Sequence, residues 1–177
     1  MITFQVKTES RNHLYKPSAA QVGAIRCGMQ TYEMDVNSLK SAMQYGRTTQ
    51  PAILSTQGFV SQQVFIVDVD NTDTLRTVKE NKQISKKSGI CPNIIVRTFS
   101  STQENQKHHL VFVTDKPVRS LEKRNRLQKA LTELFAGDVA CNDVSRIFFG
   151  GNLIYFSQSA WYLIDADIKK LIGGDVA

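Results

Sequence analysis

The sequence predicts an α+β domain, in which apolar strands and amphipathic helices follow one another. Three short runs rich in β-branched and aromatic residues, at 64–69, 92–99 and 107–115, are typical of buried strands. Two longer stretches, 74–87 and 120–135, carry the capping and spacing signals of helices. With 177 residues, of which 41% are hydrophobic and 21% charged, the chain is long enough to bury one substantial core. We therefore expect a single domain.

Composition narrows the class of protein further. No run approaches the roughly 18 apolar residues of a membrane span, and the start of the chain lacks the apolar stretch of a secretory signal peptide. We therefore expect a cytoplasmic protein with no membrane partner. The three cysteines, Cys27, Cys91 and Cys141, are far apart and in no zinc-binding spacing. We expect reduced thiols, with neither a disulfide nor a zinc site.

The first 50 residues are expected to carry little functional signal. They predict a short strand at 2–7, a weakly amphipathic segment at 19–25, a loop at 31–35 and a capped helix at 37–43. His13 lies in a polar segment and is more typical of a surface residue than of a ligand. After this region, residues 52–54 are a candidate strand next to the main apolar run.

The main apolar run ends in two acids, Asp68 and Asp70, separated by Val69. Side chains two apart in a strand point the same way, so both carboxylates share one face at the end of the strand. Carboxylates this close repel each other and lose hydration, and a divalent cation is the commonest compensation. Asp68 and Asp70 are therefore candidate ligands of one cation or of a pair. The alternative is a strand that simply ends in an acidic turn.

Two basic helices are the next feature. Residues 71–73 offer N-caps for a helix over 74–87, which Ser88 and Gly89 end, and a second helix covers 120–135 and ends at Gly137. Their basic residues are Arg76, Lys79, Lys82, Lys86 and Lys87 in the first stretch and Arg119, Lys123, Arg124, Arg126 and Lys129 in the second. With a net charge of +6, such clusters suit a polyanion that is bound through its phosphates. A basic helix face is, however, as often simply solvated.

A cationic and titratable cluster opens the strand at 107–115. Alternation puts Lys107 and His109 on one face and His108 on the other, so one histidine can face the acidic strand. Pro117 is expected to break this strand. By itself, a pair of histidines at a strand entrance is more often structural or exposed than functional.

A loop with two acids follows the second basic helix. Asp138 and Asp143 lie in this loop, and Arg146 begins the next apolar run. Gly150 and Gly151 then allow a backbone or a ligand to approach closely. The remaining elements expected are a hairpin strand at 153–156 and a short helix at 168–171.

The order of these motifs resembles the archaeo-eukaryotic primase superfamily, and more narrowly the primase-polymerase domains carried by phages, plasmids and other mobile elements. The residues that carry the resemblance are Asp68-Val69-Asp70, then Thr98-Phe99-Ser100 with Lys107-His108-His109 before an apolar strand, then Asp138 followed by Arg146. The resemblance covers residues 50–152, and the first 45 residues add nothing to it. It implies an RRM-like antiparallel sheet as catalytic core, with packed helices and a small N-terminal α/β unit. Over 1–177 it implies one primase-polymerase catalytic domain, divided into an N-terminal subregion (1–50), the core (51–156) and a C-terminal extension (157–177).

The resemblance also implies a site for two divalent cations, Mg²⁺ or Mn²⁺. Asp68, Asp70 and Asp138 would be catalytic and would hold the metals, with Asp143 as the alternative to Asp138. Nucleotide contacts would come from a set of polar side chains: His109, Lys107, His108, Ser100 and Arg146, with Ser101 as a further donor. Lys107 stands where a serine is more usual in the family, so the choice between His109 and His108 stays open.

The implied activity is DNA-templated nucleotidyl transfer, which makes or extends primers for the replication of a mobile element. The partners would be a single-stranded DNA template and primer, NTPs or dNTPs, and a helicase domain or another replication partner. Two further functions fit the same residues. One is an RRM-like single-stranded nucleic-acid-binding module without catalysis, and the other is a metal-dependent nuclease.

Overall fold

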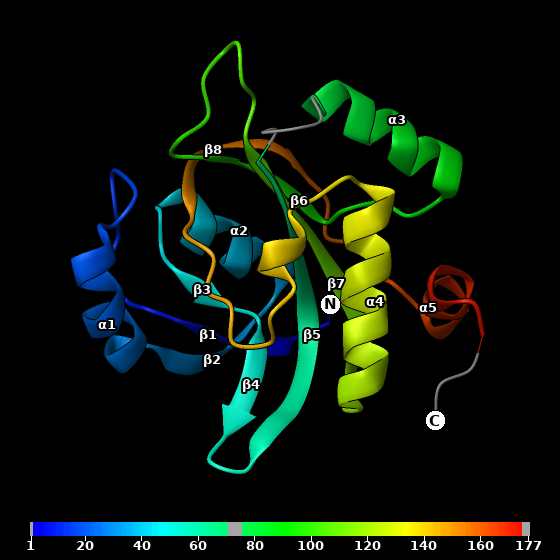
Figure 1. The fold of residues 1–177 in the computed structure, drawn as a ribbon, viewed down its shortest axis with the longest axis horizontal. Helices are drawn as coiled ribbons and strands as arrows, with labels where there is room; N and C mark the ends of the chain where they lie inside the picture. The colour runs from blue at the N-terminus through cyan, green and yellow to red at the C-terminus, as the bar shows by residue number, and fades with distance from the viewer. Residues whose placement is uncertain (1, 71–75, 175–177) are drawn as a thin grey trace.

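The computed structural model describes residues 2–70 and 76–174, and Figure 1 shows their arrangement. Within these ranges two antiparallel sheets are combined with five α-helices, so the predicted α+β class is confirmed. The strands are β1 (Phe4–Thr8), β2 (Gln30–Met34), β3 (Thr49–Gln50), β4 (Ala52–Ser55), β5 (Gly58–Val69), β6 (Ile94–Thr98), β7 (His108–Val118) and β8 (Gly151–Ser157). The helices are α1 (Ala19–Gly28), α2 (Val36–Gln44), α3 (Val78–Ser88), α4 (Leu121–Leu134) and α5 (Asp165–Ile172), with a 3-10 turn, η1 (Val139–Cys141).

The larger sheet has the strand order β4-β5-β7-β6-β8, and every neighbouring pair is antiparallel. The apolar runs predicted as strands form β5, β6 and β7, which lie side by side at its centre. The prediction that Pro117 breaks its strand was wrong, because β7 continues to Val118. The pairing of β5 with β7 shifts register between Gln62 and Val64, which lets the strand pass a proline that has no N–H to donate.

Each face of the larger sheet is covered by different elements. Phe65, Val67 and Val69 point into a core that includes residues of α4 and α5, and Val78 and Ile84 of α3 pack against it. Val64 and Ile66 point the other way, into a core shared with α2 and β1. Because side chains alternate along β5, Asp68 projects on the face that α2 and β1 cover. In Figure 1, α4 runs alongside β5.

The N-terminal region forms a second sheet with the order β2-β1-β3. The prediction of a loop at residues 31–35 was wrong, because Gln30–Met34 is the strand β2 and pairs with β1 over its whole length. This segment is largely exposed and has no apolar run, so only its pairing partner makes it a strand. The predicted helix at 37–43 is confirmed as α2, in which Asp35 caps the N-terminus by accepting a hydrogen bond from Ser38 N at 2.7 Å.

The first basic helix begins later than the sequence indicated. Thr77 is the N-cap of α3, and its hydroxyl accepts from Glu80 N at 3.2 Å while Glu80 accepts from Thr77 N at 2.7 Å. The N-caps predicted at 71–73 lie outside the described residues. Gly89 ends the helix in a left-handed conformation with φ of 78°, as expected. None of the helices in the described parts of the chain is long and apolar enough to cross a membrane.

Candidate active site

The pairing of β5 with β7 brings the acidic strand end against the Lys-His-His cluster. Asp68 stands opposite His109 in the register, and His109 Nε2 lies 3.3 Å from Asp68 Oδ1. Lys107 Nζ lies 2.7 Å from Asp70 Oδ1. The predicted alternation is confirmed, because Lys107 and His109 both reach the acids. His109 is therefore the histidine that faces the acidic strand.

His108 points to the other face of the sheet. Its side chain is fully buried, and its Nε2 lies 2.9 Å from Asn81 Nδ2 on α3. Its Nδ1 lies 3.3 Å from the Gln106 carbonyl oxygen, so a proton on Nδ1 satisfies both contacts. Burial lowers the pKa of His108 to about 4. His108 thus lies outside the cavity described below, because alternation along β7 turns it into the core, and we do not keep it among the nucleotide-binding candidates.

Neutral burial of His108 predicts acid sensitivity. The unfolded chain takes up the proton near the ordinary histidine pKa of 6.5, while the folded chain does so only near pH 4. The contribution of neutral His108 to the free energy of unfolding is therefore fully present well above pH 6.5. It decreases as the pH drops toward 4, with a loss of about 2 kcal/mol at pH 5. Urea unfolding of the wild type and of His108→Gln at pH 7.5 and pH 5 measures this. The variant should have the smaller pH dependence, and equal pH dependence in the two proteins would contradict the prediction.

Asp138 is held next to Asp68 by the chain that leaves α4. Asp138 N donates to the Asp68 carbonyl oxygen at 2.8 Å. Gly137 makes this approach possible, because a Cβ at this position would collide with Val67 Cγ1. The Cys141 thiol then lies 3.5 Å from Asp68 Oδ2 and 3.6 Å from Asp138 Oδ2, so both carboxylates contact one sulfur.

Asp143, the alternative to Asp138, is hydrogen-bonded to Ser145. Its Oδ1 accepts from both Ser145 N and Ser145 Oγ at 2.6 Å. It does not line the cavity that contains the other acids. The geometry therefore favours Asp138 as the partner of Asp68 and Asp70.

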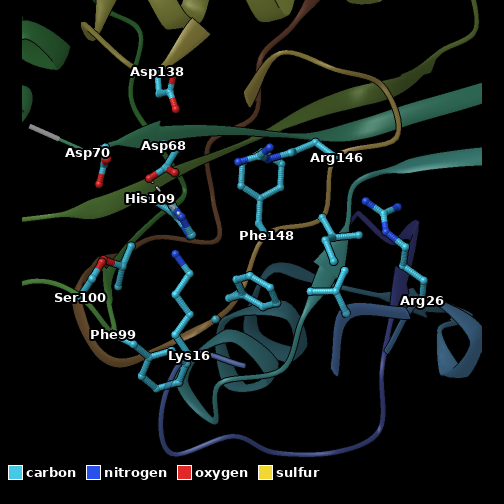
Figure 2. A pocket seen from close by; sticks show the side chains of 15 residues that line it. Lys16, Arg26, Asp68, Asp70, Phe99, Ser100, His109, Asp138, Arg146 and Phe148 are labelled. Carbon is cyan, nitrogen blue, oxygen red and sulfur yellow. Dashed lines mark hydrogen bonds and ion pairs between the residues drawn. The ribbon is translucent and has the colours of Figure 1, made fainter. Parts of the chain in front are cut away.

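These side chains line one cavity of about 330 Å³. Figure 2 shows the carboxylates of Asp68, Asp70 and Asp138 at one end, with Lys16 pointing into the space between the walls. The lining residues are Lys16, Val22, Arg26, Asp68, Asp70, Thr98, Phe99, Ser100, His109, Asp138, Arg146, Ile147, Phe148, Phe149 and Gly150. Of the predicted nucleotide-binding residues, His109, Ser100 and Arg146 are therefore in the wall, and Lys107 is connected to it through Asp70. Ser101 is instead buried, and its hydroxyl accepts from Lys107 N at 2.9 Å.

The N-terminal region contributes to this cavity, which corrects the expectation that it carries little functional signal. Lys16, from the segment before α1, and Val22 and Arg26, from α1, all line it. Arg26 Nη1 also donates to the Ser145 carbonyl oxygen at 3.1 Å, which ties α1 to the loop before Arg146. No motif marks these residues in the sequence, and only the packing of α1 against that loop brings them to the site.

The electrostatics of the site favour an ionised Asp68. Burial acts to raise the pKa of Asp68, but the charge and hydrogen bond of His109, together with Cys141 and Arg146, outweigh it and hold the pKa below its usual value. Burial, and then the charge of Asp68, raise the pKa of the Cys141 thiol to about 12. Cys141 is therefore protonated at neutral pH and acts as a donor to these carboxylates.

The acids fit a divalent metal by their chemistry. Carboxylate oxygens are the ligands that Mg²⁺ and Mn²⁺ prefer, and Asp68, Asp70 and Asp138 all face one cavity. Among the described residues no group of three His, Cys, Asp or Glu side chains is close enough together to hold an ion. Lys107 pairs with Asp70 instead, and His109 lies within 3.3 Å of Asp68. The three carboxylates are therefore suitable ligands for a divalent cation, and side chains that can carry positive charge contact two of them.

No family model matches the chain, and no curated protein sequence matches it. Among solved structures, the chain is similar to the AEP domain (PP-N190) of the cyanophage S-2L primase-polymerase, PrimPol. The TM-score is 0.53 at 13% sequence identity, over 96% of this chain and 88% of that one. At this identity the likeness concerns the fold. The chain thus shares the fold of that domain.

Proposed function

We propose that this protein is a DNA-templated nucleotidyltransferase of the primase-polymerase type. The observation that carries the proposal is the meeting of Asp68, Asp70 and Asp138 at one end of a cavity with Lys16, Arg26 and Arg146 in its walls. Carboxylates that can hold metal ions, next to cationic side chains that can bind phosphates, suit a reaction that transfers a nucleotidyl group. The shared fold with a primase-polymerase domain supports the same class of reaction.

Asp68, Asp70 and Asp138 would hold two cations, Mg²⁺ or Mn²⁺. When bound, such cations lower the pKa of an attacking 3′-hydroxyl and neutralise the charge of the triphosphate and of the leaving pyrophosphate. Cys141 contacts the carboxylates of Asp68 and Asp138 and keeps both turned to the same side. Lys107 holds the carboxylate of Asp70 from the rim of the cavity.

The basic residues of the cavity would bind the triphosphate of the incoming nucleotide. Charge builds on the phosphate oxygens in the transition state, so fixed cations stabilise it more than the ground state. Arg146 and Lys16 are the best placed, and Ser100 can donate a further hydrogen bond. The His109 ring packs edge-on against Phe148, with centroids 5.5 Å apart, which fixes the direction of its nitrogen toward the acids.

The finer points of the proposal concern its substrates and its setting. We propose a single-stranded DNA template and primer with NTPs or dNTPs, in the replication of a mobile element, with a helicase domain or another replication partner. We also propose that residues 1–177 act as one catalytic domain. The cavity walls, which combine residues from the N-terminal region and from the core, support this last point.

The test is an incorporation assay on unprimed and primed templates with Mg²⁺ or Mn²⁺ and labelled nucleotides. We expect primers or extended products that depend on both the template and the metal. Template binding without any incorporation would support the single-strand-binding module instead. Degradation of the template when no nucleotide is added would support a nuclease.

Lys16 provides a test of the N-terminal contribution. We expect Lys16→Gln to lower kcat/KM for the nucleotide about tenfold, mainly through kcat, because it removes one charge-assisted contact to phosphate oxygens on which charge builds in the transition state. Lys40→Gln, on α2 and outside the cavity, is the control with the same change of charge. Steady-state kinetics of both variants measure the effect. A kcat/KM for Lys16→Gln equal to that of the control would remove Lys16 from the binding site.

A further inference from the structure

A second, basic groove lies on α3, and the proposed reaction does not use it. Its volume is about 690 Å³, and its lining residues are Thr77, Val78, Lys79, Lys82, Gln83, Lys86, Gln106 and Tyr155. Three of them are lysines and none is acidic. In Figure 1, α3 and β8 both lie at the upper end of the larger sheet. Because α3 packs on the core shared with α4 and α5, the groove is on the sheet face opposite to Asp68.

The three lysines form one stripe along the helix. Lys79, Lys82 and Lys86 are three and four residues apart, which places them on the same side of α3, while Asn81 and Ser85 are buried on the other side. Like charges at this spacing repel one another, so the stripe stabilises the helix only when an anion lies along it. Among the described residues no carboxylate forms an ion pair with any of the three.

Two further contacts shape the groove. Glu80 is the acid nearest to the stripe in sequence, but its carboxylate accepts from the backbone and hydroxyl of Thr77 at 2.7 and 3.0 Å, so it serves the helix cap. The Lys82 ammonium lies 5.3 Å from the centre of the Phe156 ring, which directs it toward β8. Tyr155, the residue before it, is half-buried against the core and lines the groove.

We propose that this α3 groove binds single-stranded nucleic acid. The lysine stripe holds successive phosphates, and a base stacks on the exposed part of the Tyr155 ring. A row of cations beside an aromatic ring is the combination that binds single strands without regard to sequence. This proposal extends the proposed function. It rests on that function in one respect, namely that the bound strand is the template. It is tested in EDTA without nucleotides, so that its failure is separate from a failure of catalysis.

The first experiment measures binding of a fluorescein-labelled oligo(dT) of 20 nucleotides by anisotropy at several salt concentrations. The groove variant is Lys79→Gln, Lys82→Gln and Lys86→Gln together. The control is Arg11→Gln, Lys40→Gln and Lys116→Gln together, which lie outside the groove, the cavity and both basic stretches and lower the net charge from +6 to +3 equally. Loss of three phosphate contacts should reduce the slope of log K against log salt by about 2 in the groove variant. Equal slopes in the two variants would overturn the proposal.

The second experiment concerns the ring. Tyr155→Phe keeps the aromatic face and should bind as the wild type does, whereas Tyr155→Leu keeps apolar packing without that face and should bind about tenfold more weakly. Circular dichroism of both variants establishes that the fold is intact. Equal affinities of the two variants would overturn the stacking contact. If a poly-aspartate peptide competes as well as unlabelled oligonucleotide, the groove recognises acidic protein segments and the proposal fails.

Discussion

Asp68→Asn and Asp70→Asn are each expected to lower nucleotide incorporation by about 10³-fold or more. Each change removes a charged oxygen ligand from the proposed metal site, and metal ions contribute several kcal/mol of transition-state stabilisation, at about 1.4 kcal/mol for each factor of ten. Asparagine has the same shape and keeps an acceptor for His109 and Lys107, so the fold should be retained. Single-turnover incorporation with saturating Mn²⁺ measures the effect.

Asp138 and Asp143 give a matched pair for the same site. Asp138→Asn should lose incorporation as Asp68→Asn does, whereas Asp143→Asn should keep most of it, because its remaining oxygen still accepts from Ser145. Titration with Mn²⁺, followed by its electron paramagnetic resonance signal, gives a readout that does not depend on turnover. The Asp138 variant should bind Mn²⁺ more weakly than the Asp143 variant. Full incorporation by Asp68→Asn and Asp70→Asn would remove the metal assignment altogether.

Gly151→Ala is expected to lower the free energy of unfolding by about 3 kcal/mol. A Cβ at Gly151 would collide with the Arg97 carbonyl oxygen, which is backbone of the paired strand β6 and cannot rotate away. The two strands would have to separate at the irregularity where Thr98 faces Gly151. Overpacking of this kind costs about 1–3 kcal/mol, and more where backbone must move. In thermal unfolding the midpoint should fall by about 6–12 °C.

Gly23→Ala is the control for this measurement. Gly23 lies inside α1, and a Cβ there would meet no atom within 4 Å. Replacing a helical glycine by alanine should raise the free energy of unfolding by about 0.5–1 kcal/mol. The same substitution, glycine to alanine, should thus change the free energy of unfolding in opposite directions at the two positions. A Gly151→Ala protein as stable as the wild type would mean that β6 and β8 do not approach as closely as described.

The central strands and the helices could be predicted because they depend on short-range patterns. The β-branched run before Asp68 can only be buried, and its period of two fixes that Asp68 and Asp70 share a face. The leucine spacing of α4 is equally local: Leu127 and Leu131 lie four residues apart on one face of the helix, and both are fully buried. The strand β2 was missed, because its polar residues gain strand structure only from hydrogen bonds to β1.

By itself, then, the sequence determined the α+β class, the acidic strand end and the face of β7 that Lys107 and His109 occupy, because alternation and helical spacing follow from backbone geometry alone. Tertiary structure decided which distant residues meet there. It placed Asp138, and not Asp143, beside Asp68 through the hydrogen bond of Asp138 N to the Asp68 carbonyl oxygen, and it brought Lys16 and Arg26 to the cavity. Such contacts join residues far apart in the chain, and the packing of α1 and of the loop after α4 sets them, which no local pattern encodes.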